Sequence, residues 1–166
     1  MIVQIPFEDI EIGKPLGKLT KGPMSPAHIM RWSAAMENWH RIHYDQPFAT
    51  GHDKLPDVLI NGSWKQHVLV QLMKDCLGPD GWLWKIEFRY KAMDVAWDTL
   101  HGIAEPVQKT IIDGLGLVRC KVQLVNQRHE ATTVGSAVGV LPLKDGKPVP
   151  YPFVPTSEHH AFWQTT

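Results

Sequence analysis

One helix that is apolar over most of its surface constrains the fold of this chain more than any other feature. Its apolar residues recur every three or four positions: Trp64, Val68, Leu69, Leu72, Met73 and Cys76. Asn61-Gly62-Ser63 offers capping residues before the helix, and Gly78-Pro79 ends it. Such a helix must be covered on several sides, so we expect it to be deeply buried. Trp64, and Trp32 of an earlier helical stripe, are expected in the core rather than in a pocket.

Extended segments follow this helix one after another. In residues 82–89 large apolar side chains alternate with mostly charged ones, as is typical of a strand. Three more extended stretches are expected over 98–107, 116–126 and 132–143, with a turn at 127–130. Strands grouped after helices favour the α+β class. An antiparallel sheet wrapped around one apolar helix fits this order best, and that arrangement is called the hotdog fold.

The rest of the chain is less regular, and we expect residues 1–166 to form a single domain. Ser25-Pro26 is typical of a helix start, because serine caps the first turn and proline fits the first helical position. The remaining segments are expected to be a helix over 26–37, loops and short extended pieces over 1–24, an irregular stretch over 39–60, and a proline-rich C-terminal tail along the surface over 148–166.

Charge and composition argue against several classes of function. Lys and Arg together number 17, as do Asp and Glu, so the formal net charge is zero, whereas nucleic-acid binding needs a basic surface. No apolar run approaches the roughly 20 residues that span a bilayer, and the first residues do not resemble a signal peptide. Two cysteines cannot form a disulfide framework. We therefore expect a cytoplasmic protein with no nucleic-acid or membrane partner.

Polar side chains gather just past the first helix. Two imidazoles, a guanidinium, a carboxamide and a carboxylate lie close together there: His40, His43, Arg41, Asn38 and Asp45. Irregular segments supported by a rigid helix often hold catalytic groups. The alternative is a polar loop that satisfies its own backbone.

Metal binding and nucleophilic catalysis fit this chain less well. His40 and His43 are three positions apart with Asp45 nearby, but there is no Cys pair and no His-Glu-x-x-His motif. Neither cysteine has neighbours that would activate a thiol, and Ser63 lacks a nucleophile-elbow motif. We expect no metal and no redox cofactor.

The polar segment resembles the signature of the MaoC-like (R)-specific enoyl-thioester hydratases and 3-hydroxyacyl dehydratases. In that family a helix ends in Gly-Asp-x-Asn-Pro, followed by Ile-His-x-Asp and an Ala four positions on. Ile42-His43-Tyr44-Asp45 and Ala49 match this pattern in register, and Asn38 falls where the family has its catalytic Asp. The run from His40 to Asp45 is more similar still to the mesaconyl-CoA-hydratase-like branch.

Later segments resemble the same family in the same order, so the resemblance covers about residues 8–143. Val58-Leu59-Ile60-Asn61-Gly62 is similar to the family's apolar strand, its His-Gly pair and the start of its central helix, with Asn61 in place of the His. Asp98-Thr99-Leu100 is similar to its Gly-Asp-Thr-Leu, with Trp97 in place of the Gly.

This resemblance implies reversible hydration of a 2-enoyl thioester linked to CoA or to a carrier protein. In the family an Asp and a His hold the water and share the proton transfers, while a backbone N–H at the start of the central helix polarises the thioester oxygen. Here His43 is the candidate acid/base. Asn38 can orient a water but cannot take its proton. The amides of Gly62 and Ser63 would form the oxyanion site, although Gly62 could equally serve close packing of helix and strand.

Other residues of the segment have candidate roles around this centre. Arg41 either holds the loop or reaches a carboxylate or phosphate of the substrate. Asp45 is expected to fix the loop or to orient the catalytic histidine. His40 and Asn61 are candidate substrate-binding residues, and Trp97 is expected to narrow or cap a binding tunnel.

Two further functions stay open. A hotdog thioesterase usually has an Asp or Glu on the central helix or facing it, but residues 62–73 contain none. A catalytically silent hotdog subunit would bind acyl thioester, or complete an interface, for an active partner. Asn38 and Asn61 favour this possibility, since both depart from the family pattern. The expected partners are an acyl-CoA or acyl-carrier substrate and a second hotdog subunit, in a homodimer or a heteromer.

Overall fold

The computed structural model describes residues 5–164 of the chain. In chain order its elements are η1 (Phe7–Asp9), β1 (Gly17–Lys21), α1 (Pro26–Ala35), η2 (Arg41–His43), α2 (Gln46–Gly51), α3 (Gly62–Leu77), β2 (Trp82–Tyr90), β3 (Leu100–Ile112), β4 (Leu115–Asn126), β5 (Ala131–Pro142) and α4 (Ser157–Gln164).

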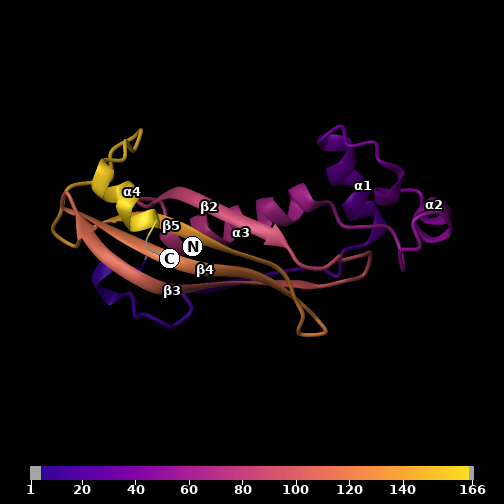
Figure 1. The fold of residues 1–166 in the computed structure, drawn as a ribbon, viewed down its shortest axis with the longest axis horizontal. Helices are drawn as coiled ribbons and strands as arrows, with labels where there is room; N and C mark the ends of the chain where they lie inside the picture. Colours follow the sequence, from indigo (N-terminus) through magenta and orange to yellow (C-terminus); the bar gives the residue numbers. More distant parts are fainter. Residues whose placement is uncertain (1–4, 165–166) are drawn as a thin grey trace.

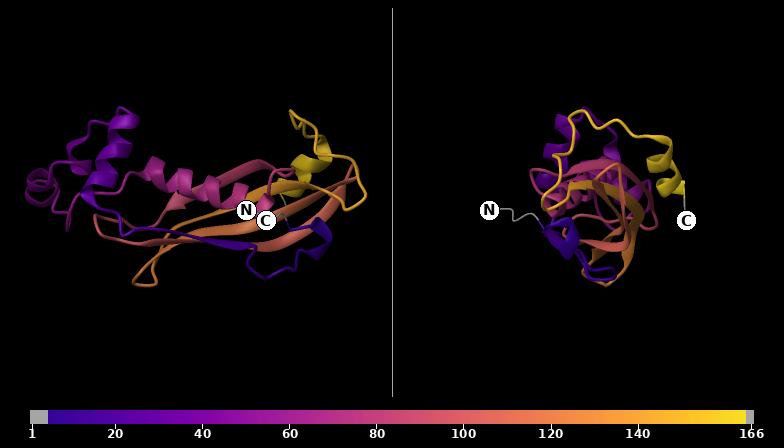
Figure 2. Two further views of the ribbon diagram at one scale, coloured as in Figure 1. Left: turned by 180° about the vertical axis from the view of Figure 1, so that it is seen from behind. Right: turned by 90° about the vertical axis from the view of Figure 1, so that its left-hand side faces the viewer.

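The five strands form one antiparallel sheet in the order β1-β3-β4-β5-β2. Figure 1 shows α3 lying along this sheet, and the end-on view of Figure 2 shows the strands curving around it. The predicted α+β hotdog fold is therefore confirmed. The four predicted strands are present, and β1 adds a fifth at the edge, within the N-terminal region where only short extended pieces were expected.

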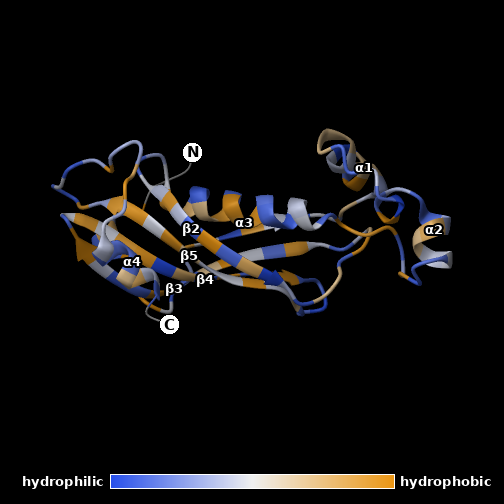
Figure 3. Cartoon of the chain, turned by 45° about the horizontal axis from the view of Figure 1, so that its top comes forward, coloured by the Kyte–Doolittle hydropathy of each residue, from blue (hydrophilic) through white to orange (hydrophobic). Residues whose placement is uncertain are grey.

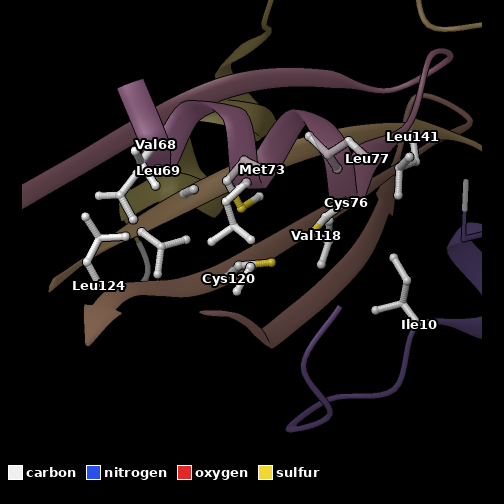
Figure 4. Packing of buried hydrophobic residues seen from close by; sticks show 14 of the residues in the cluster. Ile10, Val68, Leu69, Met73, Cys76, Leu77, Val118, Cys120, Leu124 and Leu141 are labelled. Atoms are coloured by element: carbon white, nitrogen blue, oxygen red, sulfur yellow. The ribbon is translucent and has the colours of Figure 1, made fainter. Parts of the chain in front are cut away.

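The core lies between α3 and the concave face of the sheet. In Figure 4 the labelled side chains of α3 point towards residues of the strands, among them Val118, Cys120 and Leu124. The predicted stripe is almost fully buried at Val68, Leu72 and Cys76, while Trp64 is only half-buried. Lys65 on the first turns of the same helix is also buried, so α3 is enclosed on more than its apolar face.

Helices α1 and α2 lie beyond the end of the sheet, past the first turn of α3 (Figures 1 and 3). We call residues 22–61 the overhang. Helix α1 begins as predicted, with the Ser25 side chain accepting a hydrogen bond from the His28 amide and Pro26 at the first helical position. The expectation of an irregular stretch over 39–60 is wrong in part, because η2 and α2 lie within it. Asp45 starts α2 by accepting from the Phe48 amide.

Two segments beyond the overhang also differ from expectation. Strand β3 extends past the predicted end at Val107 to Ile112, because a register shift between Pro106 and Gln108 accommodates the proline within the ladder. The C-terminal tail contains α4, which was not predicted. Phe153 and Phe162 pack there against β4 and β5 on the outer face of the sheet, so the tail forms a second apolar layer.

Candidate active site

His43 is the buried histidine of the overhang, and only 6% of it is exposed. Its ring Nδ1 lies 2.8 Å from the carbonyl oxygen of Leu59. Since a carbonyl only accepts hydrogen bonds, Nδ1 carries the proton, and Nε2 of the neutral ring is left as an acceptor. Burial lowers the pKa of His43 below 6.5, against the effect of the Leu59 carbonyl, and the neighbouring His40 lowers it further. At neutral pH the ring is therefore an uncharged base.

The backbone that carries Leu59 is fixed on both sides. The Leu59 amide donates to the carbonyl of Ile42 at 2.8 Å, so η2 and this segment hold one another. The Ile60 amide donates to the carbonyl of Asp94 at 2.9 Å, and Leu59 forms a bridge with Val95. The orientation of His43 therefore depends on the loop between β2 and β3 as well as on its own segment.

The Asn38 side chain forms a hydrogen bond within its own loop. Its side-chain oxygen accepts from the His40 amide at 3.3 Å, and among residues 5–164 no hydrogen bond joins Asn38 to His43. The His40 ring lies near His43, with its centroid 6.3 Å from that of the His43 ring. A role for Asn38 in orienting water stays a prediction.

Arg41 and Asp45 hold the loop together. Arg41 donates to one carboxylate oxygen of Asp45 from Nε at 2.9 Å and from Nη2 at 2.6 Å, and its guanidinium lies over the Phe48 ring. The hydrogen bond from Arg41 lowers the pKa of Asp45, and the Phe48 amide lowers it further. Of the two roles considered for Arg41, the structure shows the loop-holding one. Asp45 fixes the loop, while the Leu59 carbonyl orients His43.

The start of α3 differs from the expected cap. Asn61 occupies the N-cap position, but its side chain makes no capping hydrogen bond. Instead it exchanges hydrogen bonds with Ser33 of α1, at 3.0 and 3.2 Å. The amides of Gly62 and Ser63 therefore stay uncapped by Asn61, at the positive end of a sixteen-residue helix.

Gly62 also serves close packing. A Cβ at this position would lie 2.9 Å from Cζ and Oη of Tyr90, so the tip of that side chain would have to shift to accommodate a larger residue. The Ser63 hydroxyl accepts from the indole of Trp32 at 2.9 Å, which ties α1 to the same turn of α3.

Trp97 is 60% exposed and has a φ of 73°, a backbone conformation that favours glycine. Its amide donates to the Met24 carbonyl at 2.7 Å. The residue thus joins the β2–β3 loop to the segment before α1, while its role at a tunnel stays a prediction.

A cavity of about 490 Å³ lies beside the start of α3, and sequence reasoning did not find it. Trp32 and Trp64 line it. Trp64 also packs against the core clusters as expected, whereas Trp32 belongs to neither cluster. Lys21, His28 and Arg31 contribute ionisable groups to its lining. Lys21 comes from β1, whereas His28 and Arg31 come from α1, and no spacing in the sequence signals that these two elements meet.

Among residues 5–164 no three His, Cys, Asp or Glu side chains gather closely enough to hold a metal ion. No helix in that range has the length and apolar character needed to cross a membrane.

Comparison with known proteins identifies the family. The model of the type 2 hydroxyacyl-thioester dehydratases matches residues 15–98, just over half of the chain, and this range contains His43 and Gly62. The chain belongs to the type 2 hydroxyacyl-thioester dehydratase family. The resemblance to MaoC-like hydratases and dehydratases is thereby confirmed at the level of the family, while the mesaconyl-CoA-hydratase-like branch stays a prediction.

Solved structures share the fold of this dehydratase-family chain at low sequence identity. The (R)-hydratase of A. caviae involved in PHA biosynthesis is 17% identical, with a TM-score of 0.71 over 81% of this chain and 99% of that one. The MaoC-like dehydratase of Rhodospirillum rubrum is 17% identical, with a TM-score of 0.73 over 84% and 98%. A chain of the ChsH1-ChsH2 complex of Mycobacterium tuberculosis is 20% identical, with a TM-score of 0.65 over 80% and 98%. The search of curated proteins finds no match.

Proposed function

We propose that this chain catalyses the reversible addition of water to a 2-enoyl thioester, or the reverse dehydration of the 3-hydroxyacyl thioester. The observation that carries the proposal is the buried, neutral His43, held through Nδ1 by the Leu59 carbonyl. The amides of Gly62 and Ser63, which the Asn61 side chain leaves uncapped, are the proposed donors to the thioester oxygen. Membership of the dehydratase family supports the reaction class.

In the proposed reaction Nε2 of His43 removes a proton from water as the water oxygen bonds to the β carbon. The electron pair of the double bond moves towards the α carbon and the thioester oxygen. The Gly62 and Ser63 amides donate to that oxygen while its charge develops. In the simplest scheme the imidazolium then returns the proton to the α carbon. No change of redox state is involved, so acid–base groups of the chain suffice.

The substrate is proposed to be a CoA- or carrier-linked thioester in the cytoplasm. The cavity at the start of α3, with Trp32 and Trp64 in its lining, is proposed to hold a bulky apolar acyl chain. A comparison of crotonyl-CoA with longer enoyl-CoA substrates tests this assignment. Trp64→Ala is expected to shift the preference towards larger acyl groups.

The test of the reaction is hydration of crotonyl-CoA, followed by loss of the conjugated-thioester absorbance. His43→Ala is expected to lower kcat by about 100- to 10,000-fold, the usual contribution of a general acid–base group. Circular dichroism and acyl-CoA binding should stay near wild type. His160→Ala, at an exposed position on α4, is the matched control. Full activity in His43→Ala would rule out His43 as the acid–base group. Release of free thiol from acyl-CoA would indicate a thioesterase instead.

A catalytically silent subunit is the second candidate, because Asn38 has a carboxamide where the family has a carboxylate. The side-chain oxygen of Asn38 accepts a hydrogen bond from the His40 amide. Asn38→Asp keeps an acceptor for that amide and restores the charge. An inert wild type that becomes active as Asn38→Asp would favour the silent subunit. An active wild type that is slowed by Asn38→Asp would favour chemistry built around the carboxamide.

We further propose that the chain pairs with a second hotdog subunit, in a homodimer or a heteromer, through an edge of its sheet. β1 and β2 are the edge strands, and unpaired edges are usually covered. Light scattering of the purified chain at micromolar concentration should give about twice 18.8 kDa for a homodimer. A value of 18.8 kDa would leave only a heteromer, which co-purification with a second hotdog chain would reveal.

A further inference from the structure

The Tyr90 side chain reaches the start of α3. Tyr90 is the last residue of β2, and a Cβ built on Gly62 would lie 2.9 Å from both Cζ and Oη of its phenol. That Cβ position is two bonds of about 1.5 Å from the Gly62 amide nitrogen, so the Tyr90 hydroxyl oxygen lies within about 6 Å of this nitrogen.

The direction of approach is as informative as the distance. The Cα–Cβ bond of a helical residue is tilted towards the N-terminus of its helix, which is the end from which the free amides of the first turn project. The Tyr90 hydroxyl therefore lies on the side of Gly62 towards which these amides point. Two donors up to about 6 Å apart can share one acceptor, because each hydrogen bond spans about 3 Å.

Two neighbours hold the Tyr90 ring in place. The ring centroid of Phe88 lies 5.6 Å from that of Tyr90. The Lys65 ammonium lies 5.1 Å from the Tyr90 ring centroid, while it donates hydrogen bonds to Asp94 and to the Ala92 carbonyl. Both contacts involve the ring, so they position the phenol without occupying its hydroxyl.

The Tyr90 hydroxyl is available to a ligand. Within residues 5–164 it forms no hydrogen bond with another residue, and 49% of Tyr90 is exposed. Burial of the remainder raises the pKa of Tyr90 above 10. At neutral pH the hydroxyl therefore keeps its proton and can donate a hydrogen bond.

We propose that the Tyr90 hydroxyl is a third donor to the thioester oxygen, beside the amides of Gly62 and Ser63. This inference rests on the proposed hydratase function and concerns its oxyanion site. As water adds to the β carbon, negative charge develops on the thioester oxygen, and the O–H of Tyr90 donates a hydrogen bond to that oxygen without giving up its proton. Tyr90 is thus a catalytic residue that stabilises the enolate, while His43 carries the proton.

Tyr90→Phe removes the donor and keeps the ring with its contacts to Phe88 and Lys65. We expect kcat for crotonyl-CoA hydration to fall about 100-fold, the usual cost of losing one oxyanion donor, with KM within about twofold. Tyr151→Phe, at an 86% exposed position of the C-terminal tail, is the matched control and should retain wild-type kcat.

A bound enolate supplies a readout that does not depend on turnover. Acetoacetyl-CoA has an enolate form that absorbs in the near ultraviolet and carries part of its charge on the thioester oxygen. Donors to that oxygen favour the enolate, so the pH at which half of the bound acetoacetyl-CoA is ionised should rise by about one unit in Tyr90→Phe. The same midpoint should stay unchanged in Tyr151→Phe.

The two measurements together decide the role of Tyr90. Wild-type kcat in Tyr90→Phe, or a fall in kcat with an unchanged enolate titration, would overturn the proposal and leave His43 as the base. A wild type that hydrates no enoyl-CoA, but whose enolate titration still depends on Tyr90, would overturn the proposed hydratase function and support the hydroxyl as a donor to the thioester oxygen.

Discussion

The sheet with α3 and the overhang are stabilised in different ways. The sheet is joined by continuous antiparallel ladders and encloses one large apolar cluster centred on α3. The overhang has short helices and a small apolar cluster that includes Ile29, Val58 and Ile60. Its geometry depends on polar pairs between distant segments, such as Ser33 with Asn61. The candidate site thus lies where directional hydrogen bonds, more than apolar burial, set the positions of side chains.

The largest expected effect comes from a buried ion pair between α3 and the β2–β3 loop, at the point where the Asp94 carbonyl accepts a hydrogen bond from Ile60 of the overhang. Lys65 on α3 donates to Asp94 at 2.8 Å and to the Ala92 carbonyl at 3.1 Å, and the two charged side chains are 4% and 0% exposed. Lys65→Met leaves the Asp94 carboxylate buried without its partner, and we expect a loss of about 3–5 kcal/mol in the free energy of unfolding. Urea denaturation measures it.

The double variant Lys65→Met with Asp94→Leu is the control for that measurement. Removing both charges should recover most of the lost stability, because a buried pair is often replaceable by apolar side chains. The backbone carbonyl at position 94 can still accept a hydrogen bond from Ile60 in the double variant, so we expect its hydration activity to be close to wild type. A loss below about 1 kcal/mol in Lys65→Met would contradict a stabilising role for this buried pair.

In the sheet region we expect a comparable loss of stability with no loss of chemistry. Leu72 of α3 is 1% exposed, and Leu72→Ala should lower the free energy of unfolding by about 2–5 kcal/mol. Under conditions where the variant is folded, kcat should match wild type, because Leu72 belongs to the sheet core and not to the overhang. A lower kcat in the folded variant would contradict the separation of the two regions.

The same contrast explains what the sequence could predict. Helix α3 and the four consecutive strands can be predicted from the sequence, because the apolar side chains that an element buries in a core must recur on one of its faces. His43 was found through motif resemblance. The Ser33–Asn61 and Lys65–Asp94 pairs were not found, because each joins residues far apart in the chain and a single polar residue has no period. Asn61 even carried a misleading signal, since its N-cap position predicted a cap that the structure does not form.

Breaking the Ser33–Asn61 pair should affect activity more than stability. Ser33→Ala leaves the buried Asn61 amide unpaired, at a cost of about 1–3 kcal/mol. Asn61 already has the N-cap backbone, so its freed side chain can turn to accept from the first amides of α3 and regain part of that cost. Those amides would then be unavailable to the thioester oxygen. We expect a roughly tenfold lower kcat with a net stability change below about 1 kcal/mol, the energy of about one hydrogen bond.

The matched control is Ser25→Ala, which removes the cap of α1 and should cost about 1 kcal/mol without lowering kcat. Equal kcat values in Ser33→Ala and wild type would show that the α3 amides do not serve the reaction.

The smallest expected effect is a pH dependence that each region shows separately. Burial lowers the pKa of His43 in the overhang and of His159 in α4 below 6.5. As the pH falls through 6.5, the unfolded chain binds protons at these positions before the folded chain does, so the free energy of unfolding decreases. His43→Gln and His159→Gln should each remove part of this decrease between pH 7 and pH 5. The lowered pKa values of Asp45 and Asp98 affect the free energy of unfolding only at more acidic pH, outside this range.

Only His43 should also set the acid limb of the pH profile of kcat/KM, which we expect below pH 6.5 because the base form of His43 persists there. If His159→Gln shifted that limb, the pH response of activity would belong to the whole fold and not to the overhang.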